Sequence, residues 1–387
     1  MGLSTAYHAM LRNPNLKVAL LEKENAISKH QTGRNSGVIH SGIYYKPGSQ
    51  KALNCKKGYD ELINFCNINE IKYDLCGKII VATSKEELPS LTKIYNNGLL
   101  NGLDGIKKIN SNEILEIEPH CVGIKGIYVP QTGIIDYKNV SMKYAELFLK
   151  FGGEIYLNEK VVKVSYLEKE NKSLIKTEKN EYFSNKIVNC SGLYSDKVAK
   201  MINKSFDIQI LPFRGEYYNL KKEKEYLVKN LIYPVPNPNF PFLGVHFTRM
   251  INGGIEAGPN AVLAYAREGY SNRTINLSEL IEILTHSGFQ KIAKKYWRDG
   301  MQELYRSYSK NAFTSALQKL IPEIHRDDLY RGNSGVRAQA CDKSGTLHDD
   351  FIIFEHKNTI NVCNAPSPAA TSSFSIGESI GRMLKNI

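Results

Sequence analysis

The stretch "HQTGRNSGVIHSGIYY", residues 30–45, concentrates residue types that could do chemistry. Three glycines and several small hydroxyl and amide residues leave little room for bulky apolar side chains. This composition predicts a loop whose backbone approaches a ligand closely. Arg34 and two histidines add positive charge and the capacity to transfer protons. The alternative interpretation is a glycine-rich surface turn without a ligand.

The residues in front of this loop have the pattern of half a dinucleotide-binding unit. A helix is predicted by one apolar stripe, formed by Leu3, Ala6, Tyr7, Met10 and Leu11. Residues 18–21 then form a short apolar run, typical of a buried parallel strand, that ends at Glu22. In a complete βαβ unit, a first strand and G-x-G-x-x-G precede the helix, and an acidic residue follows about 20 positions later. Gly2 and Glu22 fit the last glycine and the acid, whereas the sequence lacks the first strand and the earlier glycines.

Length and composition predict a globular protein of two domains, with 387 residues of which 42% are hydrophobic. No apolar run is long enough for a membrane span, and early charges interrupt any signal peptide. We therefore expect a cytoplasmic location, with peripheral contact to the inner face of the cell membrane left open. Seven cysteines without a C-x-x-C pair predict neither a metal site nor a disulfide framework. The net charge of +12 comes from scattered lysines, which disfavours nucleic acid as a partner.

Helical and strand patterns alternate along the chain, which predicts an α/β architecture. Pieces with nucleotide-fold character lie at the start, the middle and the end. Helices are predicted at residues 51–68, 138–150, 277–320 and from about 369. We therefore predict a discontinuous nucleotide-binding domain of residues 1–68, 137–212 and 334–387. A second, α+β domain, built on an antiparallel sheet, is predicted for residues 69–136 and 213–333.

Several motifs together closely resemble the L-2-hydroxyglutarate oxidase/dehydrogenase family, flavoenzymes of the D-amino-acid-oxidase-like superfamily. In chain order they are "HQTGRNSGVIHSGIYY", "CGKIIVAT", "PFRGEYY", "PFLGVHFTRM", "GPNAVLA", "GVRAQA" and "CNAPSPAATSS". The resemblance runs from Gly2 to about Arg382. It implies an FAD cofactor, a Rossmann-like FAD-binding domain that lacks its first strand here, and an interleaved substrate domain. The implied reaction is oxidation of L-2-hydroxyglutarate to 2-oxoglutarate by hydride transfer to flavin N5.

The resemblance also implies which residues hold FAD. Gly2 would face the pyrophosphate at the helix start, and Glu22 would accept hydrogen bonds from the ribose hydroxyls, with Lys23 nearby. Val162, or its neighbour Val161, would pack against adenine, although a core position is the alternative. The remaining cofactor-binding residues would be Thr32, Arg34, Asn35, Ser36, Ser191, Gly192, Pro366, Ser367, Ala369, Ala370 and Thr371.

The substrate of that family is a dianion with a secondary alcohol, and its carboxylates call for fixed cations. Arginine binds carboxylates through its planar fork, so the candidates are Arg214, Arg249 and Arg337. Oxidation also requires a base for the hydroxyl proton, and a histidine suits this role near neutral pH. We expect His246 first and His40 second as this base. Hydroxyl donors in the pocket are expected from Tyr217 and Tyr233.

Three alternatives concern what the chain does. A related flavoenzyme could act on another 2-hydroxy acid, on glycerol 3-phosphate or on an amino acid. A chain without the first strand could instead be a non-catalytic product that does not hold FAD, because its neighbouring strands would have unpaired edges. The electron acceptor could be oxygen or a membrane quinone.

Overall fold

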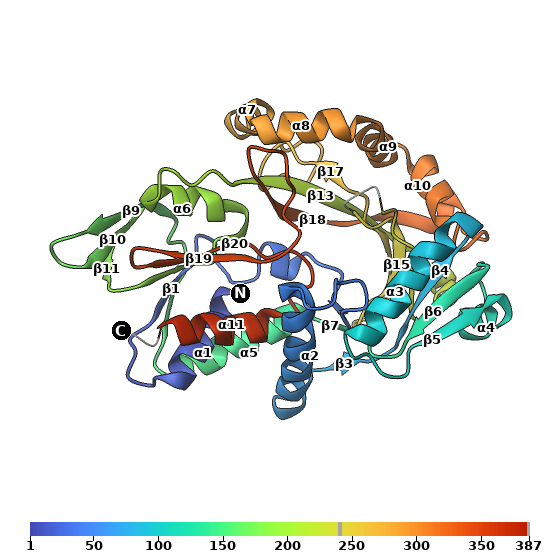
Figure 1. Cartoon of the computed structure of the whole chain (residues 1–387), viewed down its shortest axis with the longest axis horizontal. Helices are drawn as coiled ribbons and strands as arrows, with labels where there is room; N and C mark the ends of the chain where they lie inside the picture. The colour runs from blue at the N-terminus through green and yellow to red at the C-terminus, as the bar shows by residue number, and fades with distance from the viewer. Residues whose placement is uncertain (239–241, 385–387) are drawn as a thin grey trace.

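The computed structural model describes residues 1–238 and 242–384 (Figure 1). Pro241 of the "PFLGVHFTRM" motif and residues 385–387 of the predicted segment 334–387 lie outside the described residues. One part of the molecule contains helices packed on short strands, and the other contains a large sheet with helices on its outside (Figure 1). No helix in the described residues is both long enough and apolar enough to cross a membrane. The division into two domains with the boundaries given above remains a prediction.

The large sheet has the strand order β17-β13-β16-β15-β14-β4-β6-β5 in the described part of the chain, and β18 pairs with β13. Neighbouring strands are antiparallel except β14 and β4, which are parallel. This confirms the antiparallel sheet expected from the sequence. Its strands are β4 (Lys78–Ala82), β5 (Lys107–Asn110), β6 (Lys125–Val129), β13 (Gln209–Leu220), β14 (Leu231–Pro234), β15 (His246–Arg249), β16 (Ile255–Gly258), β17 (Val262–Leu263) and β18 (Leu329–Cys341).

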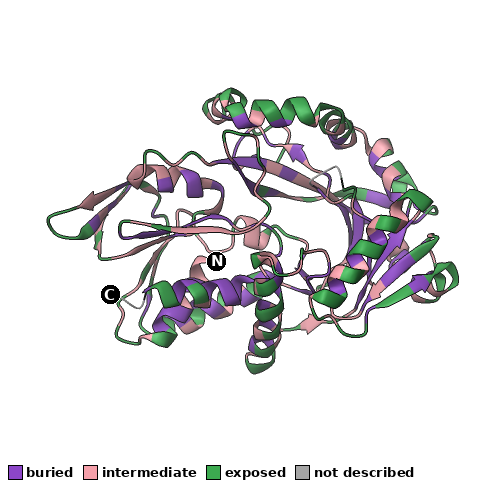
Figure 2. Ribbon diagram, viewed as in Figure 1, coloured by how far each residue is buried: buried purple, intermediate pink, exposed green. Residues whose placement is uncertain are grey.

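Helices cover the outside of this sheet (Figures 1 and 2). They are α3 (Leu88–Leu100), α4 (Ser111–Ile117), α7 (Leu277–Thr285), α8 (Ser287–Lys295), α9 (Trp297–Tyr308) and α10 (Lys310–Leu317). The predicted helical region 277–320 is therefore helical but broken. Capping explains two of the breaks, because the side chains of His286 and Ser309 accept hydrogen bonds from the first turns of α8 and α10. Phe313 of α10 packs with Phe247 and Ile79 in the core of the sheet.

The other part of the molecule contains short sheets. A parallel pair joins β1 (Ala19–Leu21) and β8 (Glu154–Tyr156). A second parallel pair joins β12 (Ile187–Asn189) and β20 (Thr359–Asn364), and β19 (Ile352–His356) is antiparallel to β20. The remaining elements are β2 (Val38–Ile39), β3 (Tyr73–Asp74), β7 (Gly133–Ile135), β9 (Val161–Leu167), β10 (Lys172–Thr177), β11 (Glu181–Ser184) and α6 (Ser195–Ile202).

Three helices lie side by side beneath these sheets (Figure 1): α1 (Gly2–Arg12), α5 (Tyr137–Lys150) and α11 (Ser373–Met383). Helix α2 (Gln50–Ile68) lies at one end of this row of helices and contacts α11. Gly377 allows α11 to approach α1 closely, because a Cβ there would lie 2.2 Å from Ser4 Oγ. The predicted helix from about 369 begins later, at Ser373, because Pro366 and Pro368 favour a turn in front of it.

Strands β1 and β12 belong to separate sheets. Among the described strands, β1 pairs with β8 alone and β12 pairs with β20 alone, so each has a free edge. Helix α1 contacts both sheets instead: Ala6 and Met10 pack with Leu20 of β1, and Ala9 packs in a cluster that includes Val188 of β12. The structure thus shows the predicted helix and a parallel strand after Gly2, without a described strand between β1 and β12. The strand is not buried as predicted, because Ala19 is exposed and Leu20 and Leu21 are only partly buried.

A buried ion pair joins α6 to the large sheet. Arg267, which follows β17, and Asp196 of α6 are both 0% exposed. The guanidinium donates to both carboxylate oxygens, at 2.6 and 2.8 Å. Asp196 also accepts a hydrogen bond from the backbone N–H of Ile210 in β13, at 3.1 Å. The carboxylate is therefore satisfied only while both parts of the molecule keep their relative positions.

Asp196→Asn should lower the free energy of unfolding by about 3–5 kcal/mol, because it leaves the buried Arg267 charge without its partner. Chemical denaturation measures this loss. Glu178→Gln is the matched control, since Glu178 and Lys160 form an exposed pair at 2.8 Å and its loss should cost less than about 1 kcal/mol. Equal effects of the two substitutions would contradict the structural role given to Arg267 and Asp196.

Candidate active site

A cavity of about 1740 Å³ lies between the two parts of the molecule. It extends from the start of α1 along β1 and the loop 30–36 to the turn 366–370, and ends at the sheet near Tyr217 and Arg337. Typical small-molecule pockets measure roughly 300–1,000 Å³, so this cavity has room for a large ligand and a second, smaller one.

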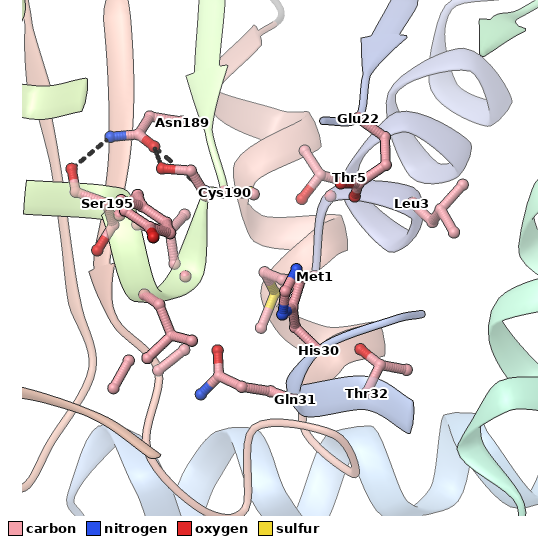
Figure 3. Close-up of a pocket in the computed structure, with 18 of the residues that line it drawn as sticks. Met1, Leu3, Thr5, Glu22, His30, Gln31, Thr32, Asn189, Cys190 and Ser195 are labelled. Atoms are coloured by element: carbon pink, nitrogen blue, oxygen red, sulfur yellow. Dashed lines mark hydrogen bonds between the residues drawn. The ribbon is translucent and has the colours of Figure 1, made fainter. Parts of the chain in front are cut away.

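The start of helix α1 opens into this cavity. Met1 and Thr5 border the cavity in Figure 3, across from Asn189 and Cys190. No side chain caps the first turn of α1 within the described residues. Helix N-termini present unpaired N–H groups and a partial positive charge. This end of the cavity therefore suits an anion such as a pyrophosphate.

A rigid glycine turn forms the opposite wall. The Asn189 side chain donates to the Ser195 carbonyl at 2.8 Å and accepts from the Ser191 hydroxyl at 2.6 Å (Figure 3). Gly192 has a φ of +54°, and a Cβ there would lie 2.8 Å from Gln31 Oε1. The positive φ favours glycine at this point, where the backbone passes close to the Gln31 side chain. Both Ser191 and Gly192 line the cavity, and their contact with a cofactor remains a prediction.

Acidic and basic side chains gather where β1 ends. Glu22 lines the cavity, and its Oε1 accepts the backbone N–H of Glu24 at 3.0 Å. Lys23 is paired with Glu24, at 2.9 Å, and with Glu268. His30 lies 3.0 Å from Glu24. These pairs hold the end of β1 in place and leave the second Glu22 oxygen available to ligand hydroxyls.

Most of the other predicted cofactor residues line the same cavity: Gly2, Thr32, Arg34, Asn35, Ser36, Pro366, Ser367, Ala369 and Ala370. Val162 does not. It is 46% exposed, and its neighbour Val161 lines the cavity because side chains alternate along β9. Thr371 is buried behind the lining, where its hydroxyl accepts the His40 backbone N–H at 3.1 Å and lies 2.8 Å from the Tyr137 hydroxyl.

These groups fit FAD. Backbone N–H groups at the start of α1 and at Gly192 suit the pyrophosphate, and the Glu22 carboxylate suits the ribose. Small residues in the turn before α11 leave space for the flavin ring. The set therefore matches the different surfaces that the cofactor requires.

Arg337 is the predicted arginine that the structure places in the cavity. Its guanidinium lies 5.1 Å from the centre of the Phe242 ring, and burial lowers its pKa. No carboxylate among the described residues forms an ion pair with Arg337. Tyr217 lines the cavity as well and interacts electrostatically with Arg337. This end of the cavity can therefore receive an anionic group.

Arg214 and Arg249 do not line the cavity. Arg214 is buried, pairs with Glu216 at 3.0 Å, and donates to the carbonyls of Gly269 and Ser271 at 3.3 Å. Arg249 pairs with Asp74. Each guanidinium is already bound within the protein. Both arginines therefore have a structural role, in contrast to Arg337.

The two predicted histidines lie together near Arg337. His40 lines the cavity, and its Nε2 is 3.2 Å from the Ser367 hydroxyl. His246 is buried, with Nδ1 2.9 Å from the Gly244 carbonyl and its ring 3.9 Å from the ring of Tyr233. Burial and nearby positive charge lower the pKa of His40 to about 3 and that of His246 to about 4. Both imidazoles are therefore neutral and able to accept a proton at pH 7.

Sequence reasoning missed two buried titratable groups here. Lys78 begins β4, and burial lowers its pKa to about 7. Burial raises the pKa of Glu256 in β16 to about 7, and its Oε2 has no hydrogen-bond partner among the described residues. The signal for Lys78 was a single lysine at the start of an otherwise apolar strand. Glu256 gave no signal, since an acid in a strand of mixed polarity is ordinary.

Comparison with known proteins identifies the family of the chain. The family model described as "FAD dependent oxidoreductase" matches residues 1–383. An L-2-hydroxyglutarate dehydrogenase of Indibacter alkaliphilus is 59% identical, covering 98% of this chain and 95% of that protein. The L-2-hydroxyglutarate dehydrogenase of Escherichia coli K12 is 43% identical, covering 98% of this chain and 90% of that protein. The mitochondrial human enzyme of the same name is 44% identical, covering 97% and 84%.

Solved structures share the fold. The L-alpha-glycerophosphate oxidase of Mycoplasma pneumoniae, solved with FAD bound, has a TM-score of 0.81 at 21% identity, covering 99% of this chain and 91% of that one. A glycine oxidase of Bacillus cereus has a TM-score of 0.73 at 16% identity, covering 100% and 94%. At these identities the likeness concerns the fold alone.

The buried histidines should make the protein less stable in mild acid. Unfolded histidine takes up a proton below about pH 6.5, whereas folded His246 stays neutral down to about pH 4, so stability falls as pH drops through this window. His246→Asn should flatten the decline by up to about 1.4 kcal/mol per pH unit. Denaturation between pH 4.5 and 7.5 measures it, with exposed His325→Asn as the control. An unchanged slope in His246→Asn would refute the neutral, buried state of His246.

Proposed function

The chain belongs to the FAD-dependent oxidoreductase family, and on this premise we propose that it oxidises L-2-hydroxyglutarate to 2-oxoglutarate. The observation that carries the proposal is the 59% identity, over 98% of the chain, with a relative that bears this activity as its name. The unpaired Arg337 in the cavity supports it, because a substrate with carboxylates needs such a cation. When bound, FAD would supply the hydride acceptor.

Arg337 would bind one substrate carboxylate through its two terminal nitrogens. The Phe242 ring lies 5.1 Å from the guanidinium and limits its movement. The side chain is exposed to the open cavity, so both terminal nitrogens are accessible to a carboxylate. Tyr217 lies next to it as a hydroxyl donor. Arg337 thereby orients the secondary alcohol toward the turn 366–370 and the histidines.

A neutral histidine would accept the hydroxyl proton at Nε2. The Gly244 carbonyl accepts the Nδ1–H of His246, which keeps Nε2 free of a proton, so His246 remains the first candidate. His40, which lines the cavity, is the second. Tyr233 stacks on His246 and orients its ring. The alcohol becomes the ketone of 2-oxoglutarate when the hydroxyl loses its proton and the carbon that bears this hydroxyl loses hydride.

Arg337→Met should lower kcat/KM for L-2-hydroxyglutarate at least tenfold, because a charge-assisted hydrogen bond contributes about 1.5–3 kcal/mol. Steady-state kinetics with FAD-loaded protein measures this loss. Arg331→Met is the matched control, since Arg331 lies on the same strand but does not line the cavity, and it should change kcat/KM less than about twofold.

A substrate panel separates the alternatives. The same protein is assayed with other 2-hydroxy acids, glycerol 3-phosphate and amino acids. A preference for an amine or for glycerol 3-phosphate would overturn the proposed substrate. A colourless protein that takes up no FAD would instead favour the non-catalytic interpretation.

We also propose that the electron acceptor is a membrane quinone, reached by peripheral contact through helices α7–α9. These helices form a row along one edge of the molecule, with their outer faces exposed (Figures 1 and 2). Exposed apolar residues on them are Leu277, Ile281, Leu284, Trp297, Met301, Tyr305 and Tyr308. Exposed cations between them are Lys291, Lys294, Lys295 and Arg298. Apolar and aromatic side chains beside lysines are the features of a surface that lies on an anionic bilayer.

Vesicle cosedimentation tests this contact. The protein should bind vesicles of phosphatidylglycerol and phosphatidylcholine more than pure phosphatidylcholine, and salt should weaken the binding. The double variant Lys294→Glu, Lys295→Glu should reduce binding several-fold, whereas Lys93→Glu on exposed α3 should not. Equal binding to both vesicle compositions, and equal binding by the wild type and both variants, would rule out this surface.

A further inference from the structure

Lys78 is a buried cation without a carboxylate partner. It is 1% exposed, and its Nζ lies 4.5 Å from the centre of the Tyr44 ring and 4.9 Å from that of Tyr233. Within the described residues, no carboxylate lies within ion-pair distance of this ammonium. Aromatic faces stabilise a buried cation but do not neutralise it. An isolated buried charge is costly, so an uncompensated one calls for a functional explanation.

The groups around Lys78 do not supply a negative charge. Cys55 of α2 faces it, and burial raises the pKa of that thiol to about 12. His40, which follows β2, and His246 of β15 are neutral, in part because the Lys78 charge opposes their protonation. Tyr44 and Tyr233 have raised pKa values and also stay neutral.

A buried carboxyl near Tyr217 and Tyr233 is only weakly acidic. Glu256 of β16 interacts electrostatically with Tyr217 and Tyr233, and its own pKa is raised to about 7. On the cavity side, Arg337 adds a second positive charge that acts on His40 and His246. This end of the cavity therefore has an excess of positive charge before any ligand enters.

We propose that Lys78 is a specificity-determining cation, whose buried ammonium between Tyr44 and Tyr233 selects substrates with a second carboxylate over substrates with a neutral end. The inference rests on the proposed function for the identity of the substrate. Arg337 binds one substrate carboxylate directly. The positive charge of Lys78 attracts the second carboxylate through space, because the tyrosines and histidines lie between Lys78 and the cavity. A bound dicarboxylate then holds Lys78 in its protonated form, so binding above about pH 7 takes up a proton.

The test measures binding of glutarate, a dicarboxylate without a hydroxyl group to oxidise, to the FAD-loaded protein by calorimetry from pH 6 to 9. In the wild type, affinity should fall as pH rises through about 7. Lys78→Met should bind glutarate at least tenfold more weakly at pH 6.5. Its remaining affinity should fall less with rising pH than in the wild type, because only Glu256 then titrates near pH 7. Lys78→Met should weaken binding of butyrate, which has one carboxylate, less than it weakens binding of glutarate. Lys125→Met is the matched control and should behave as the wild type, because Lys125 is the exposed first residue of β6.

Lys78→Arg makes the test independent of folding defects. Arginine stays charged across this pH range, so the variant should keep glutarate affinity within about threefold of the wild type at pH 6.5. Its decline at higher pH should be smaller than in the wild type, because Glu256 alone then titrates. Lys78→Met should also melt at or above the wild-type temperature, because it removes a buried unpaired charge. A Lys78→Met variant with wild-type glutarate affinity, or a Lys78→Arg variant with the wild-type pH profile, would overturn the proposal.

The two proposals fail in different ways. Protein that binds glutarate but does not oxidise L-2-hydroxyglutarate contradicts the proposed function and still allows the Lys78 comparison. Protein that oxidises L-2-hydroxyglutarate with equal efficiency in the wild type and Lys78→Met contradicts the role of Lys78 alone.

Discussion

The packing of helix α1 is the constraint on which the cofactor end of the site depends. One side of the helix contacts β1 and the other contacts the sheet of β12 and β20, although no ladder joins these sheets in the described chain. The Ser4 hydroxyl donates to the Ser373 carbonyl at 2.6 Å, which ties α1 to α11 as well. Because the helix holds both sheets apart at a fixed spacing, its uncapped N-terminus opens into the cavity between them. The glycine turn at Gly192 and the carboxylate of Glu22 then face each other across the same space.

Charge organises the other end of the cavity. Arg214, Arg249 and Arg267 are all bound to carboxylates of the protein, so their charges belong to the framework. Arg337 and Lys78 lack such partners among the described residues. Burial also keeps His40 and His246 neutral. The result is a cavity lined by the unpaired Arg337 and the neutral His40, with Lys78 and His246 buried behind the lining. Oxidation of an anionic alcohol requires such a cation and such a proton acceptor.

Sequence reasoning predicted the fold well where patterns are local. The apolar stripe of α1, the run at β1 and the glycine turn at 191–192 depend on neighbouring residues, and the structure contains all three. Sequence reasoning was weaker where the burial of a side chain determines its role. Arg214, Arg249 and Arg337 look alike in sequence, and partners distant in the chain separate them, such as Asp74 for Arg249. Val161 and Val162 differ by one step along β9, which changes the face of the strand. The structure was needed to recognise Lys78, because the sequence does not show whether a lysine at the first position of a strand is buried.

The central claim is that this cavity holds FAD beside a dicarboxylate alcohol. Anaerobic mixing of the FAD-loaded protein with L-2-hydroxyglutarate tests it most directly, because it needs no electron acceptor. We expect that the absorbance of oxidised flavin disappears, that one 2-oxoglutarate forms for each flavin reduced, and that the D enantiomer has no such effect. Stable FAD-loaded protein whose flavin stays oxidised in the presence of L-2-hydroxyglutarate would show that the cavity does not bind this alcohol productively.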